Sequence, residues 1–204
     1  LKEAFEKDIL IIEDDYNSEF RYYNRPTPSL QGLAGGRGVV YLGTFSRLLL
    51  PSIRMSFMVL PPELLPVYRE RSRYYNQTSS KTEQIALCQF IRDGHLESQI
   101  RKARKLYTAK AKKLCEDIGR IFGDRAVPHL GEAGFLVLAE IRTELTSEEI
   151  ARKAAHAGIA VRAVVPEEGK KGESMKPRIL LSCATVGMEL YEEVLQESSC
   201  SIFG

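Results

Sequence analysis

Three short apolar runs in the first third of the chain constrain the fold most, because each one stops abruptly at polar residues or prolines. The runs are DILIIEDD, VVYLGTFS and MSFMVLPP. Their length and β-branched content predict buried strands. Such strands are typical of an α/β sheet, in which ligands bind beyond the carboxyl ends of parallel strands. We therefore expect the polar residues at the ends of the first two runs to converge there: Glu13, Asp14, Asp15, Thr44 and Ser46.

The middle of the chain changes to helical patterns. The stretch SSKTEQIALCQFIRDG predicts a helix that ends at Gly94. A longer amphipathic helix follows, because apolar residues recur at three- and four-residue steps from Leu96 to Leu114. The opposite face of this helix is basic, and we interpret it as a solvated face rather than a phosphate-binding surface.

The last third alternates between strand and helix patterns and predicts a small α+β domain. The expected strands are GFLVLAEI, IAVRAVV and RILLSCATV, and the expected helices are TSEEIARKAAHAG and MELYEEVLQES. The first of these helices has clear ends, since Thr146 and Glu149 can form a capping box and Gly158 can adopt the left-handed conformation that stops a helix.

Composition excludes several classes of protein. With 204 residues, 44% hydrophobic and 27% charged, the chain can bury a core. Its formal net charge of +2 is too small to indicate nucleic-acid or membrane binding by the whole chain. No apolar run approaches the roughly 18 residues of a membrane helix, and no secretory signal is recognisable, so we expect no membrane partner and a cytoplasmic location. Scattered cysteines and histidines show no metal-binding motif, so no metal site is expected.

The acidic residues after DILII are compatible with two other kinds of site, and the sequence argues against both. A nucleotide hydrolase would need a GxxxxGK[ST] phosphate loop, which is absent. A phosphorelay receiver would need another aspartate at a later strand end, but the sequence has no aspartate between Asp15 and Asp93.

Three longer stretches occur together in an order that matches a known family: IIEDDYNSEFRYYNRPTPSLQGL, VVYLGTFSRLLLPSIRMSFMVLPPELL and KTEQIALCQFIRDGHLESQIRKARKLY. They resemble the effector domain of the MocR/GabR-type transcription regulators of the GntR family. That domain is built like a fold-type I aminotransferase that binds pyridoxal 5′-phosphate. The resemblance covers almost the whole chain.

This resemblance implies an α/β fold: a partial large domain of the PLP-dependent transferase (aspartate aminotransferase-like) type, followed by a small α+β C-terminal domain. Residues 1–94 would form the C-terminal half of the large domain, residues 95–115 a long connecting helix, and residues 116–204 the small domain. The chain would start midway through the large domain, so DNA binding would depend on an absent N-terminal winged-helix domain. The family pattern also implies a homodimer.

The same resemblance implies roles for residues around the cofactor. Asp14 would face the pyridine nitrogen and keep it protonated, which makes the ring a better electron sink. Tyr16 would form a hydrogen bond with the phenolic oxygen of the ring. Thr44, Ser46 and Arg54 would hold the phosphate.

Two further arginines take part in the expected site. Arg178 would bind the carboxylate of an amino-acid-like effector with its two-pronged guanidinium. Arg47 stands where the family has the lysine that bonds covalently to the cofactor. A guanidinium stays protonated at physiological pH and cannot act as that amine, so neither covalent attachment nor an intact transamination cycle is expected.

Three functions therefore compete. The favoured one is the effector-sensing domain of a regulator that binds pyridoxal phosphate and an amino-acid-like molecule. A fragment of a true aminotransferase would require a lysine at position 47. A non-catalytic remnant for dimerisation or ligand binding would require neither that lysine nor the rest of the domain.

Overall fold

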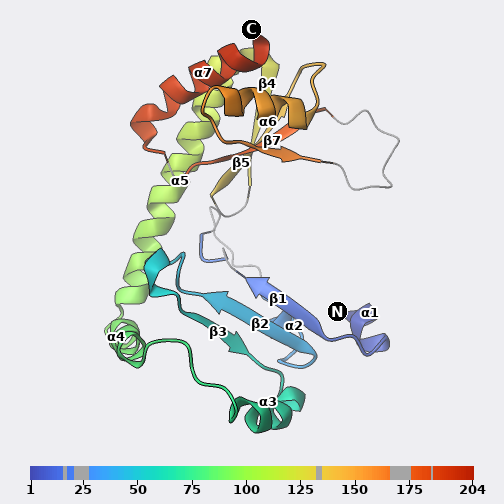
Figure 1. Cartoon of the computed structure of the whole chain (residues 1–204), viewed down its shortest axis with the longest axis vertical. Coiled ribbons are helices and arrows are strands. Elements are labelled where there is room, and N and C mark those ends of the chain that lie inside the picture. Colours follow the sequence, from blue (N-terminus) through green and yellow to red (C-terminus); the bar gives the residue numbers. More distant parts are fainter. Residues whose placement is uncertain (16–17, 21–27, 132–134, 166–175, 185) are drawn as a thin grey trace. The chain divides into compact units, whose positions relative to one another are not determined.

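The computed structural model of the chain describes residues 1–15, 18–20, 28–131, 135–165, 176–184 and 186–204. These residues form two compact units, Leu1–Ala103 and Arg104–Gly204 (Figure 1). The boundary lies inside the stretch that the sequence predicts as a connecting helix.

The first unit contains a three-stranded sheet in the order β1-β2-β3 (Figure 1). Strand β1 (Ile11–Asp15) runs parallel to β2 (Val39–Thr44), and β3 (Ser56–Val59) runs antiparallel to β2. All three strands lie where the sequence predicts them.

The prediction that all three are buried is wrong for two of them, since no residue of β1 is buried and all four residues of β3 are exposed. In β1 exposed and partly buried residues alternate, whereas β2 begins with the buried pair Val39 and Val40. The physical reason is position, because β2 is the central strand of the described sheet and β1 and β3 are its edges.

Short helices accompany this sheet. They are α1 (Lys2–Glu6), α2 (Leu30–Leu33), α3 (Leu65–Ser72) and α4 (Lys81–Arg92), with 3-10 turns η1 (Pro51–Ile53) and η2 (Pro62–Leu64). Helix α2 packs against β2. Helix α4 is the predicted one, and Gly94 just beyond it has a φ of 74°, which suits glycine.

Helix α5 (His95–Phe122) is the long amphipathic helix that the sequence predicts. Its predicted apolar face, from Leu96 to Leu114, is the less exposed one, with Ala111 and Leu114 buried. Most of the basic residues on the opposite face are exposed, as expected of a solvated surface.

The second unit contains a four-stranded sheet in the order β4-β5-β7-β6, with every neighbouring pair antiparallel. Its strands are β4 (Ala126–Leu130), β5 (Leu136–Ile141), β6 (Arg162–Val164) and β7 (Arg178–Ser182). Its other elements are α6 (Ser147–His156), α7 (Tyr191–Phe203) and the turns η3 (Gly123–Arg125) and η4 (Met188–Leu190). The expected small α+β domain is confirmed.

One face of this sheet supplies much of the buried core of the second unit. Val137 and Ile141 of β5 and Ile179 of β7 are at most 1% exposed, and so are Ile150 of α6 and Leu195 of α7. The opposite face carries the alternate residues of the same strands, which include Arg178.

No helix in the described part of the chain is both long and apolar enough to cross a bilayer.

Candidate functional site

The acidic end of β1 divides into residues with structural partners and one without. The carboxylate of Glu13 accepts hydrogen bonds from the backbone N–H groups of Leu30 and Gln31 at 2.8 and 3.0 Å. It therefore satisfies donors at the start of α2 that have no partner inside the helix. Glu13 is thus engaged by the fold.

Asp15 is engaged as well. Its carboxylate accepts hydrogen bonds from the backbone N–H of Ser18 at 3.0 Å and from the hydroxyl of Tyr41 at 2.8 Å. Burial and this bond to Asp15 raise the pKa of Tyr41 to about 12, so the hydroxyl stays protonated and remains a donor.

Asp14 differs from its neighbours. It is exposed, and within the described part of the chain its side chain has no hydrogen bond or ion pair. Asp14 lies opposite Leu42 in the parallel register, and Thr44 lies two residues further along β2. Because side chains alternate between the faces of a sheet, Asp14 and Thr44 share one face.

The end of β2 is held to the start of β3 by a small hydrogen-bond cluster. The hydroxyl of Thr44 donates to the carbonyl of Met55 at 3.4 Å and accepts from the backbone N–H of Ser46 at 3.2 Å. The backbone N–H of Phe45 also donates to the Met55 carbonyl, at 3.0 Å. Since Met55 is 4% exposed, this connection is anchored in the core.

That cluster places Arg54 next to the hydroxyl-bearing turn. Thr44 pairs with Ser56, and the backbone hydrogen bond from Phe45 to Met55 lies beside that pair, so Ser46 and Arg54 both follow at this end of the two strands. Arg54 is exposed and adopts a left-handed conformation, with φ 44° and ψ 34°. The fold therefore brings Thr44, Ser46 and Arg54 to one end of the β2–β3 pair.

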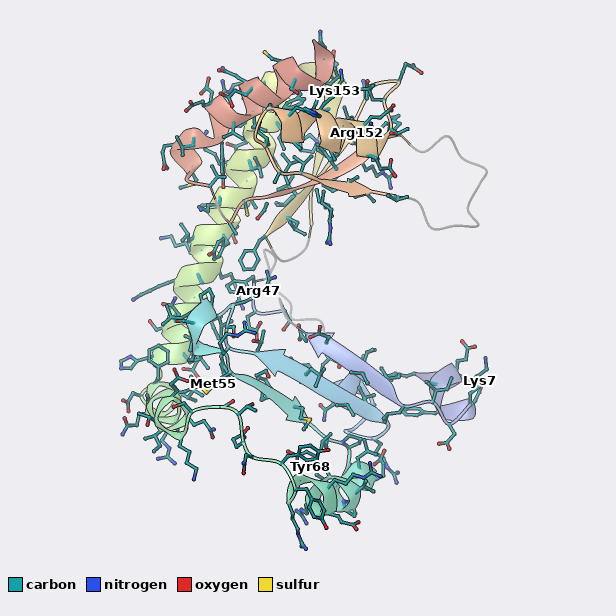
Figure 2. The ribbon with its side chains drawn as sticks, in the orientation of Figure 1. Lys7, Arg47, Met55, Tyr68, Arg152 and Lys153 are labelled. Atoms are coloured by element: carbon teal, nitrogen blue, oxygen red, sulfur yellow. The ribbon has the colours of Figure 1, made fainter. Side chains whose placement is uncertain are left out.

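Arg47 is exposed in the turn after β2, one residue beyond Ser46 (Figure 2). Tyr16, the other residue expected at the cofactor ring, lies outside the described residues.

Arg178 is the first residue of β7, in the second unit. One of its terminal nitrogens, Nη2, lies 3.6 Å from a carboxylate oxygen of Glu140. Its Nε atom is buried and has no hydrogen-bond partner in the described part of the chain. The backbone N–H of Arg178 donates to the hydroxyl of Ser147 at 3.0 Å, which ties β7 to the start of α6.

The described residues fit a pyridoxal phosphate group without a covalent bond. A free carboxylate suits the pyridine nitrogen, and two hydroxyls with a guanidinium suit the phosphate. At position 47, however, the side chain ends in a guanidinium rather than the amine that would bond to the cofactor, so covalent attachment does not fit. Among the described residues, no group of three metal-binding side chains is close enough to hold an ion.

The sequence did not show that Glu13 and Asp15 would have partners within the fold while Asp14 stays exposed. It also did not show that Glu140 would form an ion pair with Arg178. Nothing in a run of three acids shows which of them the fold will use. Glu140 carried a weak signal, because it is a charged residue inside the otherwise apolar strand LVLAEI.

Comparison with known proteins identifies the relatives of the chain. No family model matches it. It is 39% identical over 164 residues to YdeL, an HTH-type transcriptional regulator of Bacillus subtilis, and 34% identical over 152 residues to MocR, the probable rhizopine catabolism regulatory protein of Rhizobium meliloti. The chain is homologous to the MocR-type regulators. The family resemblance of the sequence is thus confirmed.

The match to the MocR-type regulators covers most of the chain but a minor part of each relative. With YdeL it covers 80% of this chain and 35% of the relative, and with MocR the shares are 74% and 31%. The chain therefore spans about a third of the length of these curated relatives.

Solved structures show that this homologue of the MocR-type regulators has an aminotransferase fold. LysN, the alpha-aminoadipate aminotransferase of Thermus thermophilus, matches with a TM-score of 0.79 at 24% identity over 100% of this chain and 52% of LysN. It was solved with N-(5′-phosphopyridoxyl)-L-leucine. The kynurenine aminotransferase of Pyrococcus horikoshii matches with a TM-score of 0.80 at 23% identity over 99% and 50%. The predicted fold class is confirmed.

Proposed function

We propose that the chain is part of the effector-sensing domain of a transcription regulator, which binds pyridoxal phosphate non-covalently together with an amino-acid-like effector. The observation that carries this proposal is the convergence of Thr44, Ser46 and Arg54 at one end of the β2–β3 pair. The homology to MocR-type regulators and the phosphopyridoxyl group in LysN support it.

Each residue of the site would make a simple contribution. The Ser46 hydroxyl would donate a hydrogen bond to a phosphate oxygen, and the Thr44 hydroxyl would do so by giving up its 3.4 Å bond to the Met55 carbonyl. Arg54 would neutralise the charge of the phosphate. Asp14, which has no hydrogen bond or ion pair within the described part of the chain, would accept a hydrogen bond from the protonated pyridine nitrogen. Arg47 would add a positive charge beside the phosphate but no nucleophile.

In a regulator of this kind the cofactor would help the domain to recognise the effector. When bound, pyridoxal phosphate supplies an aldehyde that reacts with amines and a ring that accepts electrons. Arg178 would bind the effector carboxylate through a charge-assisted hydrogen bond. DNA recognition would belong to a winged-helix domain outside these 204 residues, and such a regulator would work in the cytoplasm.

A fragment of a true aminotransferase is the second candidate. The chain is 26% identical over 163 residues to the 2-aminoadipate transaminase of Thermus thermophilus. Arg47 argues against this candidate, because transamination needs an amine at that position both to bond the cofactor and to move protons.

Position 47 provides the test of covalent attachment. We expect the chain, incubated with pyridoxal phosphate and then borohydride, to carry no cofactor on residue 47 by mass spectrometry. We expect Arg47→Lys, in a chain extended to the complete domain, to turn yellow and to be trapped by borohydride on that residue. A folded extended variant that stays colourless would show that this turn is not the cofactor site. If Arg47→Lys stays colourless in the 204-residue chain but turns yellow in the extended one, cofactor binding requires the rest of the domain.

Arg54 provides the test of phosphate binding. Arg54→Gln should weaken reversible pyridoxal phosphate binding about tenfold, the loss expected for one charge-assisted hydrogen bond. The matched control is Arg69→Gln, which removes the same charge from an exposed position on α3. Equal effects of both variants in a fluorescence titration would indicate non-specific attraction of the phosphate.

A further inference from the structure

Glu140 and Arg178 are direct neighbours on the less covered face of the second sheet. They are register partners on the antiparallel strands β5 and β7. The residues on either side of them, Ala139, Ile141 and Ile179, are buried in the core. Since alternate side chains point to opposite faces, Glu140 and Arg178 both lie on the face away from that core.

The carboxylate of Glu140 is shared unequally between two cations. Lys176 Nζ lies 3.0 Å from Oε1, whereas Arg178 Nη2 lies 3.6 Å from Oε2. The first distance is that of a hydrogen bond and the second is not. Lys176 therefore holds Glu140 directly, and Arg178 is held only by the attraction of opposite charges.

One side of the Arg178 guanidinium, formed by Nε and Nη2, therefore lacks a close hydrogen-bond acceptor among the described residues. In a guanidinium, the N–H groups of Nε and Nη2 point in parallel and match the two oxygens of one carboxylate. Here Nη2 has the distant Glu140, and Nε is buried without a hydrogen-bond partner among the residues that the structure describes. Burying an unpaired donor costs stability. A second carboxylate that reached this edge after a movement of the partly exposed Arg178 side chain would remove that cost.

Glu140 is nevertheless a competitor for that edge, because it is negatively charged. The hydrogen bond from Lys176 lowers the pKa of Glu140, and the charges of Lys176, Arg178 and His129 lower it further, although partial burial opposes them. The Glu140 side chain is 15% exposed and that of Arg178 is 37% exposed. Water therefore screens their attraction only in part.

We infer that Glu140 is a resident carboxylate which competes with the effector carboxylate for Arg178, so that the effector binds by taking over the Nε–Nη2 edge while Lys176 retains Glu140. This inference rests on the proposed function, in which Arg178 anchors the effector. It makes Glu140 a residue that sets effector affinity without touching the effector. The ligand that this edge accepts is a single planar carboxylate.

The test uses formate, the smallest carboxylate, with formamide as the uncharged control. The full chain is titrated, and binding is followed by the ¹H–¹⁵N signal of Arg178 Nε. Glu140→Gln removes the competing charge and should strengthen formate binding about fivefold, the upper range for a partly exposed charge pair. Glu144→Gln removes the same charge from an exposed position after β5 and should leave binding unchanged.

A second measurement needs no variant. In the unmodified chain, the ¹³C signal of the Glu140 carboxyl should move in parallel with the Arg178 signal as formate displaces it. The inference is overturned if the Glu140 signal stays fixed while Arg178 binds formate, if Glu144→Gln strengthens binding as much as Glu140→Gln, or if formate reaches Arg178 in neither the unmodified chain nor Glu140→Gln.

A third variant separates the inference from the proposed function beneath it. Arg178→Lys keeps the charge but loses the two-pronged edge, so the response of the Glu140 signal to formate should disappear. If that response persists, Arg178 is not the carboxylate anchor and this part of the proposed function fails. If it disappears but Glu140→Gln has no effect on binding, the inference alone fails.

Discussion

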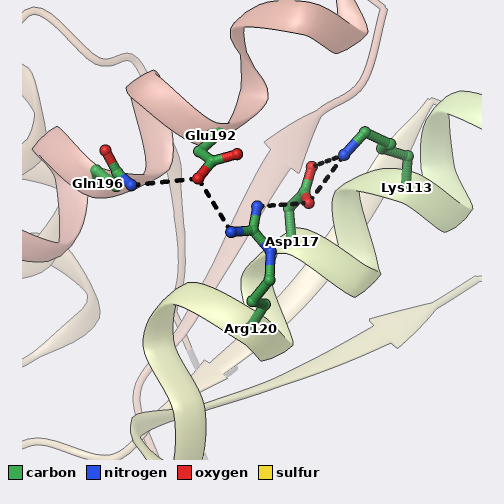
Figure 3. Close-up of polar contacts among 5 residues, drawn as sticks. All are labelled: Lys113, Asp117, Arg120, Glu192 and Gln196. Carbon is green, nitrogen blue, oxygen red and sulfur yellow. Dashed lines mark hydrogen bonds and ion pairs between the residues drawn. The ribbon is translucent and has the colours of Figure 1, made fainter.

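At the scale of single residues, Asp117 is a nearly buried charge whose cost is offset by two cations (Figure 3). Its side chain is 4% exposed. Lys113 donates to it at 2.7 and 2.9 Å and Arg120 at 3.1 Å, all within α5. Arg120 also donates to Glu192 of α7 at 3.0 Å, so the cluster joins two helices.

We expect Asp117→Asn to destabilise the chain by about 1–3 kcal/mol, because it removes the charge that two basic side chains share in a nearly buried place. Urea denaturation followed by circular dichroism measures this loss. Glu192→Gln is the control, since Glu192 is about half exposed and water screens its pair with Arg120. A loss as large for Glu192→Gln as for Asp117→Asn would contradict the central role of Asp117.

The same residue should make stability depend on pH in the acid range. Burial alone raises the pKa of Asp117, but the hydrogen bonds and charges of Lys113 and Arg120 outweigh it, so the pKa lies below its usual range. A carboxylate with a lowered folded pKa stabilises the fold above its unfolded pKa of about 4, and this contribution is lost as the pH falls through the folded pKa. The stability difference between the unmodified chain and Asp117→Asn should therefore shrink below about pH 4.

At the scale of elements, the ends of α6 were the most predictable feature of the chain. Thr146 accepts from the backbone N–H of Glu149 at 3.2 Å, and Glu149 accepts from the backbone N–H of Thr146 at 2.8 Å, so the predicted capping box is confirmed. Gly158 has a φ of 76° and follows the helix as predicted. These features depend only on neighbours in sequence, which is why the sequence alone reveals them.

We expect Thr146→Ala to lower the free energy of unfolding by about 1 kcal/mol, the usual cost of losing a helix cap. Because Thr146 is exposed, the loss would measure capping rather than burial. Thr146→Ser keeps the hydroxyl and should be close to the unmodified chain in thermal melts. If the serine variant is destabilised as much as the alanine variant, the hydroxyl is not responsible.

Elements whose burial or pairing depends on distant residues were harder to predict. Strand β4 was not predicted, and it contains Pro128, a residue type that usually argues against a strand. The structure explains this exception, since β4 is an edge strand of its sheet and pairs only with β5 among the described strands. The exposure of β3 was missed for a related reason, because an apolar run shows hydrophobicity but not what covers it.

At the scale of the whole molecule, the order of motifs predicted the fold and the family, while most of the side-chain contacts came from the structure. Thr44, Ser46 and Arg54 lie at the same end of the β2–β3 pair, because Thr44 is the last residue of β2 and pairs with Ser56, the first residue of β3. Their roles toward a cofactor stay predictions. The ion pair of Arg178 with Glu140 could not be foreseen, since it depends on which strand lies beside β7.

We expect the chain to self-associate. In the first unit, β1 and β3 each have one described partner strand, so each offers an open edge. Exposed apolar side chains accompany these edges, including Ile12 at 66% and Met58 at 45% exposure. Light scattering at several concentrations should show species larger than a monomer. A single monomeric species at high concentration would be the contrary result.

The left-handed backbone at Arg54 has a consequence for how this sequence can change over evolutionary time. A non-glycine residue in that conformation costs roughly 1 kcal/mol. Selection for stability alone would replace Arg54 with glycine or asparagine, which tolerate the conformation. If Arg54 does bind phosphate, selection for binding would keep the arginine in spite of its cost in stability. A lineage that lost the ligand would be expected to lose this arginine early.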